Sequence, residues 1–233
     1  MTSRLDGRDA HLWQFETTCI GVEPLLGLLT DDEQARAERF RRAEDRARFV
    51  IGRAMLRQLL GRYLDRAPGD IHLHTTDGGK PVLPDMPQLS FSVSHSGGHV
   101  VLALSRAGSV GIDVERVRDV ADLDSMIGRC FSTRERALID ASAGNERLLA
   151  FFRAWTRKEA FLKMLGTGLV DALDQIDCSP CADRTLQVSG PQGCARLAWH
   201  EYQPSLDHIA ALVCENPDIR VSLHRPGWFV PLL

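Results

Sequence analysis

The sequence predicts an α+β fold with two similar lobes, each built from one long helix packed on an antiparallel sheet. Apolar residues recur at helical spacing over residues 31–63 and 146–165, which predicts the two helices. Short apolar runs between turns predict the strands, and the run HVVLALS at 99–105 is echoed by HIAALVC at 208–214. Each run follows a helix by a comparable series of strands. We therefore expect a pseudo-twofold relation between the lobes, with the active site at their junction.

The composition is ordinary for a globular protein, and we predict lobes at residues 1–108 and 109–233. The chain has 233 residues, of which 44% are hydrophobic and 25% are charged. The net charge of −3 argues against nucleic acid as the main partner. The start of the chain lacks the apolar core of a signal peptide, and no apolar run approaches a membrane span. We predict a reduced, cytoplasmic protein without a membrane partner, and a monomer, because two lobes on one chain need no partner subunit.

The first lobe is predicted to begin with a strand within residues 11–20 and to continue with one long helix. Thr30 and Glu33 form a capping box that begins this helix, which extends to about Tyr63. Its polar face is rich in arginine. Interspersed acidic residues favour a solvated, salt-bridged face, and an arginine-lined phosphate site is the alternative. The arginines are Arg36, Arg39, Arg41, Arg42, Arg46, Arg48 and Arg53.

Two turns of this lobe carry groups that suit a phosphate ligand. Strands are predicted at 71–74, 89–93 and 99–105. The turn between the first two, TDGGKP, combines glycines with Lys80, but it lacks the spacing of a P-loop. The second turn, SVSHSGGH, brings hydroxyls and an imidazole together as a fair oxyanion or phosphate cradle. Because that segment is a turn rather than a helix, we do not expect its histidines to bind metal.

The segment Gly111-Ile-Asp-Val-Glu115 is the strongest single signal for chemistry. It alternates like a strand, so Asp113 and Glu115 project from one face roughly 7 Å apart. Two carboxylates on one face resist joint burial unless a cation lies between them, and Mg²⁺ suits oxygen ligands. The alternative is a solvated edge strand whose charged face meets water.

The second lobe is predicted to place a third carboxylate on its long helix. Ser132 and Glu135 form a capping box, and this cap is the role we predict for Glu135. In the helix at 146–165, Glu159 shares a face with Leu148, Phe152, Trp155 and Leu162. A carboxylate within an apolar stripe suggests a metal ligand or a general base. The alternative is a pair with Lys163, worth only a few tenths of a kcal/mol.

The rest of the chain is predicted to be a series of strands separated by turns. Gly166 is a candidate for the residue that ends the long helix. The pair Cys178 and Cys181 forms a single C-x-x-C, for which unpaired thiols in a loop are expected. The predicted strands lie near 185–189, 195–202, 208–214 and 219–223.

Taken together, these motifs resemble the 4′-phosphopantetheinyl transferases of the Sfp type. The resemblance extends from about residue 30 to about residue 215. It implies an enzyme that moves the phosphopantetheine arm of coenzyme A to a serine of an apo acyl or peptidyl carrier protein and releases adenosine 3′,5′-bisphosphate. The motifs that carry it are GKP at 79–81, FSVSHS at 91–96, GIDVE at 111–115, FSTRE at 131–135 and WTRKEAFLK at 155–163.

The resemblance also implies roles for individual residues. Asp113, Glu115 and Glu159 would hold Mg²⁺, which would also bind the pyrophosphate of coenzyme A. Glu159 would take the proton of the carrier serine, directly or through water. The remaining expected contacts to coenzyme A are Lys158 and Lys163 on phosphate oxygens, Lys80 and Pro81 at the adenine, Ser94 and His95 on phosphates, and Arg36 and Arg48 near the nucleotide.

This chain differs from the family pattern at two positions, and two other functions remain open. Ser92 stands where the family often has Asn, and Val114, between the two acids, offers no ligand, so water would fill that coordination place. One alternative is another Mg²⁺-dependent enzyme acting on a nucleotide or diphosphate. The other is a non-catalytic module that binds carrier proteins.

Overall fold

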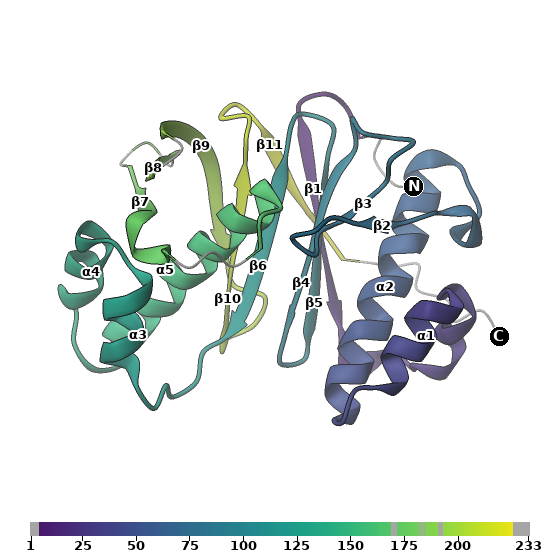
Figure 1. Ribbon diagram of the computed structural model, residues 1–233, viewed down its shortest axis with the longest axis horizontal. Coiled ribbons are helices and arrows are strands. Elements are labelled where there is room, and N and C mark those ends of the chain that lie inside the picture. The colour runs from purple at the N-terminus through teal and green to yellow at the C-terminus, as the bar shows by residue number, and fades with distance from the viewer. Residues whose placement is uncertain (1–4, 169–171, 182, 184, 191–192, 226–233) are drawn as a thin grey trace.

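The protein is an α+β molecule, as predicted. Two sheets stand against each other, and helices cover their outer faces (Figure 1). The computed structural model describes residues 5–168, 172–181, 183, 185–190 and 193–225. Within that part of the chain, no helix is both long enough and apolar enough to cross a membrane.

The first lobe packs α2 on a four-stranded sheet. The order of that sheet is β11–β1–β5–β4, and its β1–β5 and β5–β4 pairs are antiparallel. The small β2–β3 ladder lies beside it. The elements are β1 (Asp9–Glu16), α1 (Asp31–Glu38), α2 (Ala43–Leu64), β2 (His74–Thr75), β3 (Pro81–Val82), β4 (Ser90–Ser96) and β5 (His99–Ser105), with 3₁₀ turns at Thr17–Cys19, Glu23–Leu28 and Pro68–Asp70.

The prediction of one long helix from residue 31 to residue 63 is wrong, because the chain forms two helices. The capping box of Thr30 and Glu33 begins α1 as predicted, but α1 ends at Glu38 and α2 begins at Ala43. Arg42 has an extended backbone, and the ring of Phe40 packs on that of Phe49 with centroids 5.4 Å apart. No Gly or Pro marks the break, so tertiary packing outweighs local helix propensity here.

The strand predicted at 71–74 is also wrong. Ile71 follows the 3₁₀ turn Pro68–Asp70 and is fully buried in the hydrophobic core of the first lobe. Of the predicted strand, only His74 lies in a ladder, the strand His74–Thr75.

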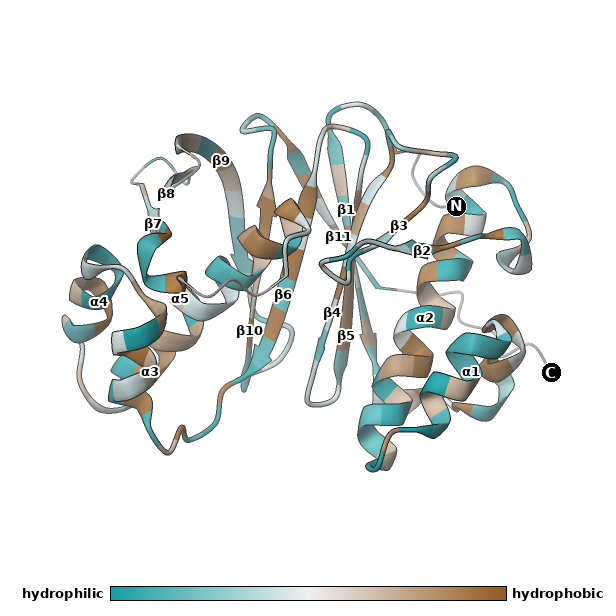
Figure 2. Ribbon diagram, viewed as in Figure 1, coloured by the Kyte–Doolittle hydropathy of each residue, from teal (hydrophilic) through white to brown (hydrophobic). Residues whose placement is uncertain are grey.

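Figure 2 shows α1 as mainly hydrophilic, which fits a helix that buries only Ala37.

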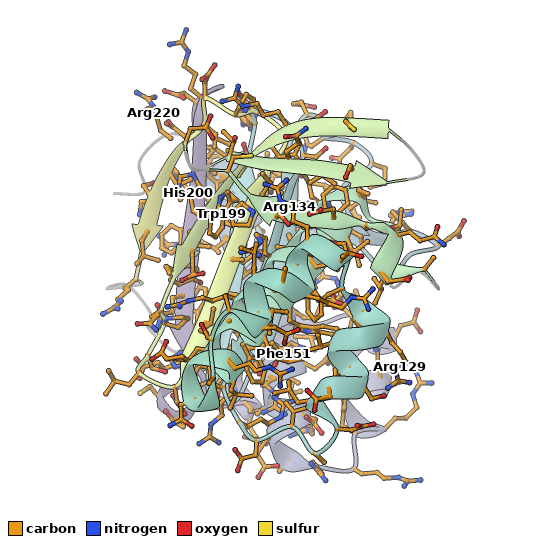
Figure 3. All side chains as sticks on the ribbon, turned by 90° about the vertical axis from the view of Figure 1, so that its left-hand side faces the viewer. Arg129, Arg134, Phe151, Trp199, His200 and Arg220 are labelled. Atoms are coloured by element: carbon orange, nitrogen blue, oxygen red, sulfur yellow. The ribbon has the colours of Figure 1, made fainter. Side chains whose placement is uncertain are left out.

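The second lobe packs α5 on a five-stranded antiparallel sheet of order β6–β10–β9–β8–β7. In Figure 3, Phe151 marks α5 and Trp199 marks β9 of the sheet that this helix covers. The elements are β6 (Val110–Arg116), α3 (Leu123–Cys130), α4 (Thr133–Asp140), α5 (Gly144–Leu165), β7 (Asp177–Pro180), β8 (Thr185–Gly190), β9 (Gly193–Tyr202), β10 (His208–Cys214) and β11 (Arg220–His224), with a 3₁₀ turn at Leu173–Gln175.

Local signals in this lobe are mostly confirmed. The capping box of Ser132 and Glu135 begins α4, and Gly166 ends α5 in the left-handed conformation at φ 76°. The C-x-x-C pair differs from the prediction in its setting, because Cys178 lies on the edge strand β7 rather than in a loop. Its thiol is unpaired, as expected, and so is that of Cys181.

The two sheets pack face to face through their central strands. Val101 on β5 and Leu212 on β10 belong to the cluster between the sheets. The alternate residues Leu102 and Val213 face the helix side of their own lobes. Each of these strands is therefore buried on both faces, which explains the matching apolar runs at 99–105 and 208–214.

The last strand crosses back to the first lobe. β11 pairs with β1 in parallel, and Arg220 forms ion pairs with Asp6 and Asp9. The first sheet is therefore not purely antiparallel. The division at residues 108 and 109 stays a prediction.

Candidate active site

A row of serine hydroxyls joins the edge strands of the two sheets. Every second residue of β4 is a serine, so these side chains share one face. Each hydroxyl accepts a hydrogen bond from a backbone N–H of β6. The serine hydroxyls thus take the place of the backbone carbonyl groups that a neighbouring strand would offer. The pairs are Ser90 with Val110 at 3.0 Å, Ser92 with Ile112 at 3.1 Å, Ser94 with Val114 at 3.3 Å and Ser96 with Arg116 at 3.0 Å.

This serine row places hydroxyls beside both acids of the GIDVE segment. Ser94 donates to Oδ1 of Asp113 at 2.8 Å, and Ser96 donates to Oε2 of Glu115 at 2.9 Å. The alternating serines are visible in the sequence, but there they indicate only an oxyanion or phosphate cradle and not a contact between strands. Ser92 is one member of the row.

Gly111 lets β6 approach α5 closely enough to bring the acids to the long helix. A Cβ atom at this position would lie 2.0 Å from the carbonyl oxygen of Ala160 and 2.3 Å from the amide nitrogen of Met164. Only glycine fits such an approach. The same stretch of α5 carries Glu159 and Lys163, so the close contact at Gly111 sets their distance from Asp113.

Lys163 contacts Asp113 directly from α5. Its ammonium donates to Oδ1 of Asp113 at 2.6 Å and to the hydroxyl of Ser94 at 2.9 Å. The Ser94 hydroxyl therefore uses its one donor and both acceptor sites within the protein. Asp113 is 4% exposed, and its other oxygen, Oδ2, is buried without a hydrogen-bond partner among the described residues.

The charge of Asp113 destabilises the charged forms of the two neighbouring glutamates. Burial, and then the charge of Asp113, raises the pKa of Glu115. Burial likewise raises the pKa of Glu159, followed by the charge of Asp113, and Lys163 only partly offsets this. Arg118 reaches Glu115 at 3.4 Å from the exposed rim. Negative charge therefore exceeds positive charge at this point.

This donor set fits a hard divalent cation. Carboxylate oxygens are the ligands that Mg²⁺ prefers, and the orphaned Oδ2 of Asp113 is a buried acceptor that a cation would satisfy. In the conformation described, however, no three His, Cys, Asp or Glu side chains of the described residues converge closely enough to surround a metal.

These residues line a cleft of about 440 Å³ at the junction of the lobes. The cleft contains all of the predicted site residues except Lys80 and Lys158. Its lining is Arg36, Arg48, Phe49, Gly52, Arg53, Gly79, Pro81, Val93, Ser94, His95, Asp113, Glu115, Trp155, Glu159 and Lys163.

The wall opposite the acids is basic. The guanidinium groups of Arg36 and Arg53 lie 5.1 Å and 5.8 Å from the ring centroid of Phe49, which orients both by cation–π contact. Arg48 donates to the carbonyl of Gly97 at 2.9 Å. Burial, followed by the charges of Lys163 and Arg48, lowers the pKa of His95. Arg53 was not among the predicted site residues, and its spacing of four from Phe49 was the available signal.

Lys80 lies in a smaller recess of about 190 Å³ that shares Glu159 and Lys163 with the cleft. Its ammonium donates to the carbonyls of Met164 at 3.0 Å and Val110 at 3.2 Å, and burial lowers its pKa to about 8. Lys80 thus links the GKP turn to the end of α5 and the start of β6.

Lys158 is not part of the cleft. It is 1% exposed, and its ammonium forms a buried ion pair with Glu135 at 2.7 Å. The capping role predicted for Glu135 is confirmed, but this ion pair was not expected.

Comparison with known proteins covers both lobes. The family described as the 4′-phosphopantetheinyl transferase superfamily matches residues 109–214, and the family described as 4′-phosphopantetheinyl transferase, N-terminal, matches residues 15–107. The 4′-phosphopantetheinyl transferase HetI of Nostoc sp. is 37% identical over 187 residues, which cover 78% of this chain and 79% of HetI. The 4′-phosphopantetheinyl transferase Sfp of Bacillus subtilis is 26% identical over 196 residues, which cover 84% of this chain and 86% of Sfp. The 4′-phosphopantetheinyl transferase psf-1 of Bacillus pumilus is 28% identical over 209 residues, which cover 84% of this chain and 88% of psf-1.

Proposed function

The chain belongs to the 4′-phosphopantetheinyl transferase superfamily and transfers the 4′-phosphopantetheinyl group to carrier proteins, and we propose that coenzyme A donates this group. We also propose that Mg²⁺ is the cofactor. The acceptor would be a serine of an apo acyl or peptidyl carrier protein, and the second product adenosine 3′,5′-bisphosphate. The observation that supports this most directly is Asp113, which has one oxygen bound to Lys163 and the other buried without a partner among the described groups.

Asp113, Glu115 and Glu159 would hold the metal, which would neutralise charge on the diphosphate oxygens of coenzyme A. Lys163 supports the same task from the protein side, because its ammonium already lies in the cleft beside Asp113. Arg36, whose guanidinium is positioned on the Phe49 ring, gives the opposite wall a positive charge for the remaining phosphate.

Glu159 is the group that would accept the proton of the carrier serine. It lines the cleft, and burial and the neighbouring carboxylates raise its pKa, which makes it a better base than an ordinary glutamate. In the step, the serine oxygen forms a bond to the phosphorus that bears the pantetheine arm. The bond from that phosphorus to the bridging oxygen breaks, and the proton passes to Glu159 directly or through water.

A mass measurement tests this proposal. The protein is mixed with coenzyme A, Mg²⁺ and an apo carrier protein, and the intact mass of the carrier is followed. We expect a gain of one phosphopantetheine group that a chelator abolishes and that Mg²⁺ restores. Breakdown of coenzyme A without a carrier would instead indicate a diphosphate hydrolase. Metal-independent carrier binding without transfer would indicate a non-catalytic module.

A further inference from the structure

We propose that Lys158 is a positioning residue for the transfer reaction and does not contact phosphate, an inference that rests on the proposed function. The motif WTRKEAFLK places Lys158 directly before Glu159, and both side chains are charged. Successive residues of an α-helix point about 100° apart, so the two side chains face different surroundings. Glu159 lines the cleft, whereas Lys158 is directed into the second lobe.

Every hydrogen of the Lys158 ammonium is already used inside the protein. It donates to Oε2 of Glu135 at 2.7 Å and to the carbonyls of Cys130 at 2.7 Å and Leu173 at 2.9 Å. An ammonium has three donors, so none remains for a phosphate oxygen. The charge also lies over the ring of Phe131, 5.0 Å from its centroid.

The groups around Lys158 come from separate elements. Cys130 is the last residue of α3, Glu135 lies in the first turn of α4, and Leu173 begins the 3₁₀ turn that follows α5. Glu135 also connects α4 to β7, because its carboxylate accepts hydrogen bonds from the backbone amides of Ser132 at 2.9 Å and Cys178 at 3.2 Å. Figure 3 labels Arg129 on α3 and Arg134 on α4, the two helices that this cluster joins to α5.

Two residues connect the groups around Lys158 to the cleft, namely Trp155 and Glu159. Phe131 packs edge-on against Trp155 with ring centroids 6.4 Å apart, and Trp155 lines the cleft. Glu159 follows Lys158 on the same helical turn. A fixed inward direction for Lys158 therefore fixes the rotation of α5 about its axis. This rotation holds Trp155 and Glu159 toward the cleft.

The test compares the wild type, Lys158→Met, and the double variant Lys158→Met/Glu135→Gln. Two quantities are measured for each folded protein: kcat at saturating coenzyme A, and the Kd for coenzyme A. In Lys158→Met the Glu135 carboxylate stays buried without its cation, so we expect kcat to fall roughly 10- to 100-fold with Kd nearly unchanged. The double variant removes that unpaired charge but still lacks the hydrogen bonds to Cys130 and Leu173, so we expect it to recover only part of kcat.

A direct phosphate contact would give the opposite pattern. Kd for coenzyme A would then rise in both variants, and Glu135→Gln would recover nothing, which would overturn the proposal. Lys163→Met is the matched control, because Lys163 lies in the cleft and its loss should weaken coenzyme A binding.

If Lys158→Met does not fold, the double variant alone tests the proposal. A wild-type Kd and a partly recovered kcat in a protein without this ammonium would exclude a phosphate contact of Lys158. Failure of the wild type to transfer would contradict the proposed function instead, and the Kd comparison would still test Lys158.

Discussion

The ammonium of Lys163 lies 2.6 Å from Oδ1 of Asp113, and Oδ2 of the same carboxylate is buried without a hydrogen-bond partner in the described part of the chain. One oxygen of this carboxylate is thus paired with a protein cation, and the other faces no hydrogen-bond donor among the described residues. Glu115 and Glu159 both have a raised pKa beside it. The arrangement suits a site that is completed by a metal ion.

Asp113→Asn is expected to reduce transfer at least about 100-fold, because an amide cannot neutralise the metal. The fold should persist, since an amide oxygen can still accept from Ser94. The rate of carrier mass gain measures the activity, and calorimetric titration measures Mg²⁺ binding. Transfer at the wild-type rate would show that Asp113 is not a metal ligand.

Ser94→Ala and Ser90→Ala form a matched pair at two positions of the serine row. Each removes a hydroxyl that accepts from β6, so each should cost about 1–3 kcal/mol in the free energy of unfolding. Only Ser94 also contacts Asp113 and Lys163, so only Ser94→Ala should raise the Mg²⁺ concentration that half-activates transfer. Equal effects of both variants on that concentration would reduce the role of Ser94 to joining the sheets.

Glu159→Gln is expected to stabilise the metal-free protein at neutral pH while abolishing transfer. The pKa of Glu159 is raised above its ordinary 4.5, so the folded state binds this proton more tightly than the unfolded state. Stability from this group is therefore present at low pH and is lost as the pH rises from 4.5 through the raised value. Replacing the carboxylate by an amide removes that loss.

Thermal unfolding in a chelator, followed from pH 4 to pH 8, measures this effect. Each ~1 kcal/mol should shift Tm by roughly 2–4 °C for a chain of this size. Added Mg²⁺ should raise Tm in the wild type and much less in Glu159→Gln. A Tm for Glu159→Gln below that of the metal-free wild type at pH 7 would argue against repulsion among the carboxylates.

Gly111→Ala is expected to separate β6 from α5. The new Cβ would meet backbone atoms of Ala160 and Met164, which cannot move aside as a flexible side chain can. We expect a loss of roughly 1–3 kcal/mol or more in stability and a loss of transfer, because Asp113 moves away from Lys163. Gly128→Ala in α3 is the control, since its Cβ meets nothing within 4 Å. Alanine there should stabilise by up to about 1 kcal/mol.

Most of the secondary structure and many site residues followed from local sequence patterns. The capping boxes at Thr30 and Ser132 and the glycine at 166 act within one helical turn, so a few neighbouring residues determine them. The alternation in GIDVE placed Asp113 and Glu115 on one face for the same reason. The break between α1 and α2 was not predictable, because the packing of Phe40 on Phe49 decides it without a Gly or Pro signal.

By itself, the sequence determined that Lys158, Glu159 and Lys163 belong to α5 and that Asp113 and Glu115 share one face of β6, because periodicity depends only on the local backbone. Only the tertiary structure decided where those charges point. Lys158 and Glu159 are adjacent and equally polar, yet one is buried against Glu135 and the other lines the cleft. The partners that separate them, Cys130, Glu135 and Leu173, lie 15 to 28 positions away along the chain. A buried charge requires such partners, and only the folded chain brings them together.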